Sequence, residues 1–350
     1  MTFKLDDVEC MRRCFALARR ATPDIKTNPR VGCVIIHDNK VIGEGYHRVY
    51  GQEHAEIDAL KSVAPTDHNL LASSSMYVSL EPCHHHGKTP PCVDAIIKAN
   101  IPRVVISCLD PNPNTHGKSV HKLKKHGVEV VTDVLAEEGR DLINDFIIQQ
   151  TMHRPYIILK WAQSKDGYMG VKDKQIWLSN DLSKLTTHKW RSELDAIMVG
   201  TDTAITDNPR LTNRRGFGHQ PIRIVLDRQG RLPGDLYLLH DDHPTWIFTC
   251  QKSYQALTPV KEVIHIEESK WSWSSILSII YEKKVGRLLI EGGKQIHKSL
   301  IKERLWDEAR IIHTPVLLGA GIKAPSIKGK IYKRYHLEGD KVFVARPAFD

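Results

Sequence analysis

The chain has 350 residues, of which 41% are hydrophobic and 26% charged, and its 50 Lys and Arg against 41 Asp and Glu give a net charge of +9. This length favours two domains, and no apolar run approaches the ~18 residues of a membrane span. The N-terminus, MTFKLDDVEC, has acidic residues and no apolar segment, so we expect no signal peptide. The basic residues are dispersed, which favours phosphorylated small ligands or a mixed surface over nucleic acid. Seven unevenly spaced cysteines favour a reducing cytoplasm, where cysteines serve metal binding or catalysis.

The first 150 residues alternate between helix and strand signals. Val8, Met11 and Phe15 recur at helical spacing, and short runs rich in Val and Ile indicate strands. We expect, in chain order, a helix at 6–20, strands at 31–36 and 40–46, a helix from about His54, a strand at 76–80, a helix at 92–99, a strand at 104–107, a helix at 118–126, a strand at 128–131 and a helix at 134–152. This order predicts an α/β layered sheet.

A second α/β domain is expected after a break near residue 150. Pro155 disfavours helical geometry at Arg154, so the last helix ends there. The predicted domains are therefore 1–150 and 151–350. In the second, we expect strands at 156–161, 195–199, 222–227, 245–249 and 287–290 and a helix at 181–192. Trp271 and Trp273 are expected to pack at the surface or at an interface.

The strongest chemical signal is His54-Ala55-Glu56, followed by Glu81-Pro82-Cys83 and Pro91-Cys92. One imidazole and two thiolates suit a tetrahedral Zn²⁺ ion and leave its fourth position for water. Cys83 and Cys92 each follow a proline, so we expect both to open helical turns whose N-termini stabilise thiolates. Glu56 is the expected catalytic acid and base, because zinc acidifies water and the leaving amine needs a proton. This pattern is typical of the zinc-dependent nucleobase deaminases.

The spacing of the two thiolates narrows the comparison. The run EPCHHHGKTPPC at residues 81–92 closely resembles the signature of the riboflavin-pathway deaminases, as do residues 28–32, 45–47 and 110–113. The resemblance implies a cytidine-deaminase-like three-layer domain whose substrate contacts come from Asn28, His47, Lys88, Thr89 and Asn112. The three consecutive histidines are expected to line the pocket, since adjacent side chains rarely converge on one ion.

The second half has a weaker signal of its own. Glu291-Gly292-Gly293 follows a predicted strand and precedes a helix, where glycines let a phosphate approach backbone N–H groups. It is not a G-x-G-x-x-G dinucleotide fingerprint. However, residues 155–160, 164–167, 176–177, 191, 195–200, 203, 207–212, 214, 221–227 and 291–293 resemble, in order, the riboflavin-pathway reductases. Those enzymes are similar in fold to dihydrofolate reductase.

The reductase resemblance implies two sets of binding residues. The NADPH site would be lined by Ala162, Trp177, Thr203, Asp207, Gly293, Lys294, Gln295, Ile296, His297, Lys298 and Ser299. The phosphoribosyl substrate would be held by Gln175, Arg191, Leu211, Arg214 and Glu291, because guanidinium groups suit bidentate phosphate recognition. Lys160 and Asp207 either assist proton transfer or form a structural ion pair. Gln175 stands where the family commonly has serine, and the 166–177 segment is one residue short, so contacts there stay open.

Together these features predict a fused, cytoplasmic deaminase–reductase that uses Zn²⁺ and NADPH. Its substrate would be 2,5-diamino-6-ribosylamino-4(3H)-pyrimidinone 5′-phosphate, which loses its 2-amino group before its ribosyl chain is reduced to ribityl. We expect a homo-oligomer that binds neither membranes nor nucleic acid. One alternative is a nucleic-acid base deaminase with a C-terminal binding domain, which leaves the thiolate spacing unexplained. Another is a structural zinc module, which needs a fourth protein ligand and leaves Glu56 without a role.

Overall fold

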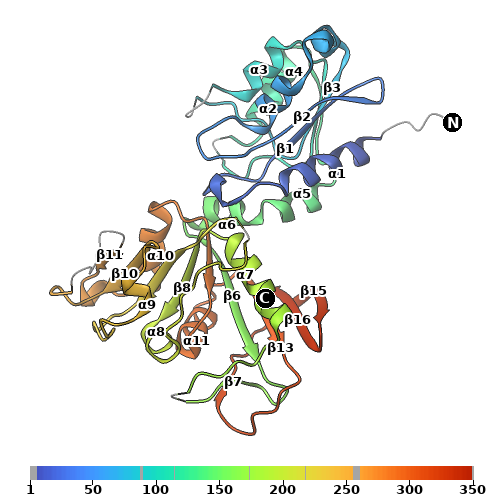
Figure 1. Ribbon diagram of the computed structural model, residues 1–350. Helices are drawn as coiled ribbons and strands as arrows, with labels where there is room; N and C mark the ends of the chain where they lie inside the picture. Colours follow the sequence, from blue (N-terminus) through green and yellow to red (C-terminus); the bar gives the residue numbers. More distant parts are fainter. Residues whose placement is uncertain are drawn as a thin grey trace. The chain divides into compact units, whose positions relative to one another are not determined.

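The structure is a computed structural model that describes residues 6–86, 90–113, 115–172, 174–216, 218–254 and 261–348. The chain divides into two compact units, Met1–His153 and Arg154–Asp350 (Figure 1). Each unit has its own sheet and its own hydrophobic core.

The first unit is built on a five-stranded sheet with the order β2-β1-β3-β4-β5. β1 (Gly32–His37) pairs antiparallel with β2 (Lys40–Tyr46) and with β3 (Ser75–Val78). β4 (Arg103–Ile106) and β5 (Glu129–Val131) extend the sheet in parallel. Asp38 and Asn39 turn the β1–β2 hairpin with positive φ angles of 46° and 62°, the conformation that two-residue hairpins favour. The predicted strands of this unit are confirmed.

Helices cover both faces of this sheet, which gives three layers. Along β1, Cys33 and Ile35 enter one core with α2 (Ala55–Ser62), α3 (Cys92–Lys98) and α4 (Lys118–Lys125). Val34 and Ile36 point to the opposite face and pack against α1 (Asp7–Ala18). This alternation follows from the two-residue side-chain period of a strand. Two 3₁₀ segments, η1 (Pro23–Ile25) and η2 (Pro65–Ser73), complete the N-terminal part.

The single helix expected at 134–152 is wrong in one respect, because the structure has two helices there. α5 (Ala136–Leu142) and α6 (Asn144–Met152) are separated by Ile143, which leaves helical geometry with φ −107° and ψ 19°. Ile143 is fully buried against the core of α2 and α3, whereas Val134 and Leu135 before α5 pack on the α1 side. The break lets one segment serve both hydrophobic cores.

The second unit holds a nine-stranded sheet with the order β11-β10-β9-β8-β12-β6-β13-β16-β15. The strands from β11 to β13 run parallel, and β16 and β15 add an antiparallel hairpin. The strands are β6 (Tyr156–Gln163), β8 (Ala196–Gly200), β9 (Ile222–Leu226), β10 (Thr245–Thr249), β11 (Lys261–His265), β12 (Arg287–Ile290), β13 (Glu308–His313), β15 (Gly329–Leu337) and β16 (Asp340–Pro347), with β7 (Tyr168–Gly170) and β14 (Ile322–Lys323) forming a separate pair. The strands predicted for this half are confirmed.

Helices again flank the sheet of the second unit. They are α7 (Asp181–Ser192), α8 (Thr201–Asp207), α9 (Tyr237–His240), α10 (Trp273–Glu282) and α11 (Lys294–Lys302), with a 3₁₀ segment η3 (Glu268–Lys270). Trp273 begins α10 and lies in the main core, and its indole N–H donates a 2.7 Å hydrogen bond to the Ser299 hydroxyl. The expected surface position of Trp273 is therefore wrong. Trp271 is only partly buried against the same core.

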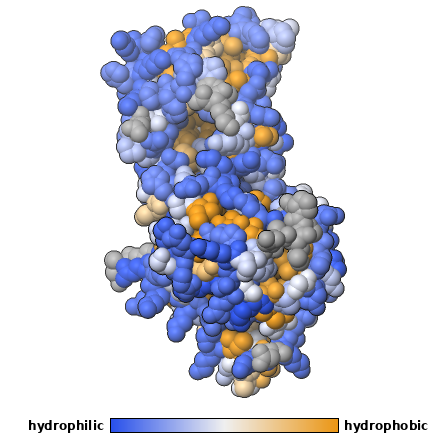
Figure 2. Space-filling model, turned by 90° about the vertical axis from the view of Figure 1, so that its left-hand side faces the viewer, coloured by the Kyte–Doolittle hydropathy of each residue, from blue (hydrophilic) through white to orange (hydrophobic). Residues whose placement is uncertain are grey.

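Hydrophilic residues dominate the face of the protein shown in Figure 2, and the apolar residues on it form separate patches. Within the described parts of the chain, no helix combines the length and the apolar character that crossing a bilayer demands.

Candidate active sites

The side chains of His54, Cys83 and Cys92 converge in the first unit. The Nδ1 atom of His54 lies 3.4 Å from the Sγ atom of each cysteine. Among the described residues these three form one group whose ligand atoms all lie within 4.8 Å of one another. Donors on a tetrahedral zinc ion lie about 3.6–3.8 Å apart at the usual bond lengths. The three donors therefore fit one zinc ion and leave its fourth corner for a small ligand.

Two helix starts and one irregular segment position these donors. His54 is the N-cap residue of α2, and Cys92 is the first residue of α3. Cys83 lies in the irregular segment between β3 and α3, so the expectation that it opens a helical turn is wrong. Its sulfur instead accepts a 3.2 Å hydrogen bond from the backbone N–H of Cys92. The first N–H groups of a helix lack intrahelical partners, which leaves this one free to stabilise a thiolate.

The electrostatics of the cluster favour a negative charge on Cys83. A hydrogen bond from the Cys92 side chain, together with the contact to His54, lowers the pKa of the Cys83 thiol despite its burial. The thiolate is the form of cysteine that binds a metal. The same hydrogen bond to Cys83, together with burial, raises the pKa of Cys92, so Cys83 is the thiol that carries the negative charge toward a cation.

Glu56 lies in the first turn of α2, two residues after His54, and is only 3% exposed. Burial raises its pKa to about 7, and the nearby charge of Cys83 adds to the effect. The Glu56 carboxyl also interacts with the Cys92 side chain, which places it directly beside the metal donors. A carboxyl group that titrates near neutral pH can accept a proton in one step and donate it in the next.

Asn28 and His47 lie next to this group. The Asn28 amide nitrogen is 2.9 Å from His47 Nε2, and His47 Nδ1 is 2.9 Å from the Glu53 carbonyl oxygen. Since a carbonyl only accepts, Nδ1 carries the ring proton and the Asn28 amide donates to Nε2. Burial lowers the pKa of His47, whose ring meets the His54 ring edge-on with centroids 5.4 Å apart. The structure thus brings two predicted substrate residues to the metal donors.

The remaining predicted deaminase residues have a mixed outcome. The backbone N–H of Asn112 donates to the Asp110 carboxylate at 2.9 Å, within the loop that follows β4. Lys88 and Thr89 lie outside the described residues. The rings of His84 and His85 are 5.7 Å apart, and neither belongs to the metal-donor group found among the described residues.

Glu81 has a role that the sequence analysis missed. Its buried carboxylate accepts hydrogen bonds from the backbone N–H groups of Asp110, Gly117 and Ser119 at 3.2, 2.9 and 3.1 Å. Glu81 therefore fixes the loop of Asn112 and also the N-terminus of α4 (Lys118–Lys125). Its place two residues before Cys83 was the available signal, because a carboxylate beside a metal donor commonly positions neighbouring groups.

A cavity of ≈ 880 Å³ opens in the second unit. Its wall combines β6, α7, α8, the loop after α8 and the end of β12. The predicted site residues on this wall are Lys160, Gln175, Trp177, Arg191, Thr203, Asp207, Leu211, Arg214 and Glu291. Residues separated by as much as 131 positions in the chain thus share one surface.

Arg191 and Glu291 form a bidentate ion pair inside the cavity. The Nε and Nη2 atoms of Arg191 donate to the two carboxylate oxygens of Glu291 at 2.8 and 2.6 Å, and Nη1 donates to the Thr212 carbonyl at 3.1 Å. The side chains are 12% and 6% exposed. The guanidinium fork of Arg191 is therefore already occupied by protein groups, and its expected grip on a phosphate stays a prediction.

Lys160 and Asp207 are both cavity residues with shifted pKa values. Burial lowers the pKa of Lys160, which the charge of Glu291 partly opposes, and burial raises the pKa of Asp207. Among the described residues, the charge that acts on Lys160 most strongly is that of Glu291 rather than that of Asp207, so both the proton-transfer role and the structural ion pair stay predictions. The backbone carbonyl of Asp207 accepts a 3.1 Å hydrogen bond from the Gln175 amide.

Part of the predicted NADPH site lies away from this cavity wall. Ala162 packs against Ile312 and Val342, and residues 293–299 do not line the cavity. His297 is fully buried, with Nδ1 bonded to the Gly293 carbonyl at 3.0 Å. The Ser299 hydroxyl is bonded to the Trp273 indole. The side chains of His297 and Ser299 therefore face the protein interior.

The Glu-Gly-Gly turn joins β12 to α11 beside the cavity. A Cβ atom on Gly292 would lie 2.5 Å from Thr203 Cγ2, so any other residue at this position would force the Thr203 side chain to shift. Gly293 has a φ of 84° and begins α11 without a side-chain cap. The first N–H groups of α11 thus remain available, which suits a phosphate.

Comparisons with known proteins find a matching family for each of the two units. Residues 5–108 match the cytidine and deoxycytidylate deaminase zinc-binding region, and residues 155–343 match the RibD C-terminal domain. The riboflavin biosynthesis protein RibD of Aquifex aeolicus is 36% identical over 320 residues, covering 90% of this chain and 89% of that protein. RibD of Escherichia coli is 30% identical over 332 residues, with 90% and 89% covered.

A solved structure from Thermotoga maritima extends the agreement to the whole fold. It is a diaminohydroxyphosphoribosylaminopyrimidine deaminase/5-amino-6-(5-phosphoribosylamino)uracil reductase, with a TM-score of 0.89 and 32% identity over 98% of this chain and 99% of that chain. The predicted combination of a cytidine-deaminase-like fold with a dihydrofolate-reductase-like fold is confirmed. This chain belongs to the RibD family of riboflavin biosynthesis proteins.

Proposed function

We propose that this bifunctional deaminase and reductase of riboflavin biosynthesis performs its two reactions at the two sites described above. The first unit removes the 2-amino group of 2,5-diamino-6-ribosylamino-4(3H)-pyrimidinone 5′-phosphate. The second unit reduces the ribosyl chain of the product to ribityl. The observation that carries the proposal is the convergence of His54, Cys83 and Cys92 beside the buried carboxyl of Glu56.

In the first unit, His54, Cys83 and Cys92 would hold a zinc ion, and their spacing and chemistry fit that ion. Zinc, when bound, acidifies water for attack on the ring carbon. Glu56 takes a proton from the attacking water and delivers it to the departing amine. Its pKa near 7 supports both transfers at neutral pH. Asn28 and neutral His47 orient the pyrimidine beside Glu56.

In the second unit, the cavity would receive NADPH and the deaminated pyrimidine together. NADPH supplies the hydride for the C1′ carbon of the sugar, while the protein orients the reactants. The uncapped start of α11 with the nearby Lys294 fits a cofactor phosphate. Lys160 and Asp207 are the groups that assist proton transfer, because burial shifts both pKa values toward neutrality. The negative charge of Glu291 opposes the effect of burial and raises the pKa of Lys160, which favours its protonated form.

The cytoplasm is the proposed location, and a homo-oligomer is the proposed assembly. All seven cysteines are free, which agrees with a reducing compartment. Sedimentation of the purified chain measures the assembly directly, and a single species at the monomer mass would contradict the second proposal.

The proposal is tested by following ammonia release and NADPH oxidation separately. We expect zinc chelation to abolish ammonia release from the diamino substrate while sparing reduction of the already deaminated compound. Cys92→Ser should lose zinc and ammonia release together, whereas Cys250→Ser, a free cysteine outside the donor group, should keep both. Absence of NADPH oxidation with the deaminated compound would contradict the reductase assignment. Ammonia release from the metal-free chain would contradict the deaminase site.

A further inference from the structure

The loop after α8 presents two guanidinium groups that have no carboxylate partner among the described residues. Arg210 and Arg214 both line the cavity of the second unit. Arg214 Nη1 donates to the Thr212 hydroxyl at 3.2 Å, and the Arg210 guanidinium lies over the Tyr237 ring, 4.3 Å from its centroid. Arg191, by contrast, is neutralised by Glu291. Positive charge that the protein does not compensate is therefore concentrated on Arg210 and Arg214.

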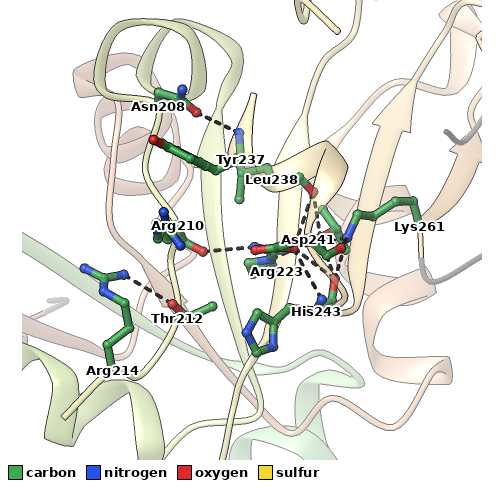
Figure 3. A network of polar contacts seen from close by, with 11 residues as sticks. Asn208, Arg210, Thr212, Arg214, Arg223, Tyr237, Leu238, Asp241, His243 and Lys261 are labelled. Carbon is green, nitrogen blue, oxygen red and sulfur yellow. Dashed lines mark hydrogen bonds and ion pairs between the residues drawn. The ribbon is translucent and has the colours of Figure 1, made fainter. Parts of the chain in front are cut away.

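Arg210 is held at both its backbone and its side chain, as Figure 3 shows. Its carbonyl oxygen accepts a 3.0 Å hydrogen bond from Arg223 Nη1. The backbone that carries the Tyr237 ring is held in turn, because the Tyr237 N–H donates to the Asn208 side chain at 2.9 Å. Restricting an arginine in advance reduces the conformational entropy that binding removes.

The anchor beneath this loop is Arg223, a strand residue of β9 with no exposed surface. All of its N–H groups are paired. Besides the Arg210 carbonyl, its partners are the Thr245 hydroxyl, the Asp241 carboxylate and the carbonyls of Leu238 and His243. Lys261 completes the network through Asp241 and the His243 carbonyl (Figure 3). A polar network whose members are hydrogen-bonded rigidifies its surroundings. The backbone of the loop that carries Arg210 is therefore held in place by this network.

The charges on the cavity wall repel one another. Burial lowers the pKa of Arg214, and the charges of Arg191, Arg210 and Arg215 lower it further. Such repulsion is relieved when an anion enters. A phosphate suits this place, since a guanidinium fork can donate two parallel hydrogen bonds to it. Arg215 also lines the cavity, and its backbone N–H donates to the Asn213 side chain at 3.3 Å, whereas the Arg210 guanidinium lies over the Tyr237 ring.

We propose that Arg210 is a second phosphate-binding residue for the reductase substrate, acting with Arg214, and that Arg223 and Tyr237 are positioning residues that hold it in place. This inference rests on the proposed function, because it assumes that the cavity receives a phosphorylated sugar. It adds a specificity determinant to that function: the loop selects the phosphorylated form of the substrate.

The test compares reduction of 5-amino-6-(5-phosphoribosylamino)uracil with reduction of its dephosphorylated form. For Arg210→Gln, we expect the KM of the phosphorylated compound to rise about tenfold with little change in kcat, since a charge-assisted hydrogen bond is lost. The KM of the dephosphorylated compound and the KM of NADPH should not change. Tyr237→Leu should raise the KM of the phosphorylated compound severalfold. Tyr237→Phe keeps the aromatic ring, so its KM for this compound should equal that of the wild type.

Arg334→Gln is the matched control, because Arg334 also lies over an aromatic ring, 5.5 Å from the Phe343 centroid, but does not line the cavity. It should leave every constant unchanged. Equal KM changes for the phosphorylated and dephosphorylated compounds, or none in Arg210→Gln, would overturn the inference while wild-type reduction still supports the proposed function. If the wild-type chain fails to reduce either compound, the proposed function itself fails.

Discussion

Replacing Glu291 by glutamine should destabilise the second unit, most strongly at neutral pH. Burial alone would raise the pKa of Glu291, but the charges of Arg191 and Lys160 outweigh it and lower the pKa from 4.5 to about 2. A difference of about 2.5 pKa units corresponds to about 3 kcal/mol of the free energy of unfolding at 1.36 kcal/mol per unit. Because the pKa is lower in the folded state, this contribution is complete above pH 4.5 and is lost as the pH falls toward 2.

Tryptophan fluorescence isolates the unit concerned. All seven tryptophans lie between residues 161 and 306, so their emission during urea unfolding reports on the second unit alone. The free energy of unfolding of Glu291→Gln should fall below that of the wild type by about 3 kcal/mol at pH 7 and by about 2 kcal/mol at pH 3.5.

Glu262→Gln is the control for removing a glutamate charge. Glu262 pairs with Lys283 at the surface, where its side chain is 46% exposed, so its loss should cost less than about 1 kcal/mol. A Glu291→Gln variant as stable as the wild type at pH 7, or a difference that does not shrink on acidification, would refute the electrostatic reasoning.

Three further substitutions test the two sites. Glu56→Gln should keep zinc, measured by metal analysis, but lose about 10²–10⁴-fold in ammonia release; a rate near that of the wild type would rule out its role in proton transfer. Glu81→Ala leaves three backbone N–H groups without their acceptor. It should lower both the thermal midpoint of the first unit and the rate of deamination, with the rate of reduction unchanged. If neither falls, the Glu81 carboxylate is not needed to position these backbone groups. Gly292→Ala pushes a Cβ to 2.5 Å from Thr203 Cγ2 and should lower reduction at least about tenfold, as misplacement near reacting groups does, whereas Gly234→Ala, with open space around it, should be neutral.

The elements and residues that the sequence predicted well are those set by local patterns. β1 reads as a strand because Cys33 and Ile35 alternate with Val34 and Ile36 toward two buried faces. The metal donors were predictable because one imidazole and two thiols at this spacing along the chain indicate a zinc site without knowledge of the fold. The outcome for Cys83 shows the limit: proline before it suggested a helical turn, but its sulfur is served by the start of the next helix.

What the sequence could not predict depends on distant partners. Arg191 and Glu291 are 100 positions apart, and nothing in either local pattern indicates that they neutralise each other. Arg223 occupies a strand whose neighbours are apolar, yet its side chain is satisfied by loops that only the folded sheet brings together. His297 and Ser299 belong to the segment predicted to line the NADPH site, and the sequence alone does not indicate that packing of α11 turns both side chains toward the interior.

The hydrogen bond from the Cys92 backbone to the Cys83 sulfur has a consequence for life with scarce zinc. The thiolate is supported by a helix end and the imidazole by the start of α2, and neither hydrophobic core of the first unit includes His54, Cys83 or Cys92. A zinc finger unfolds when its ion is removed. This unit, by contrast, should stay folded without zinc and should bind the ion again when zinc is supplied. Zinc starvation should therefore stop deamination while the second unit stays able to catalyse reduction. Supplying zinc again should restore deamination without new protein synthesis.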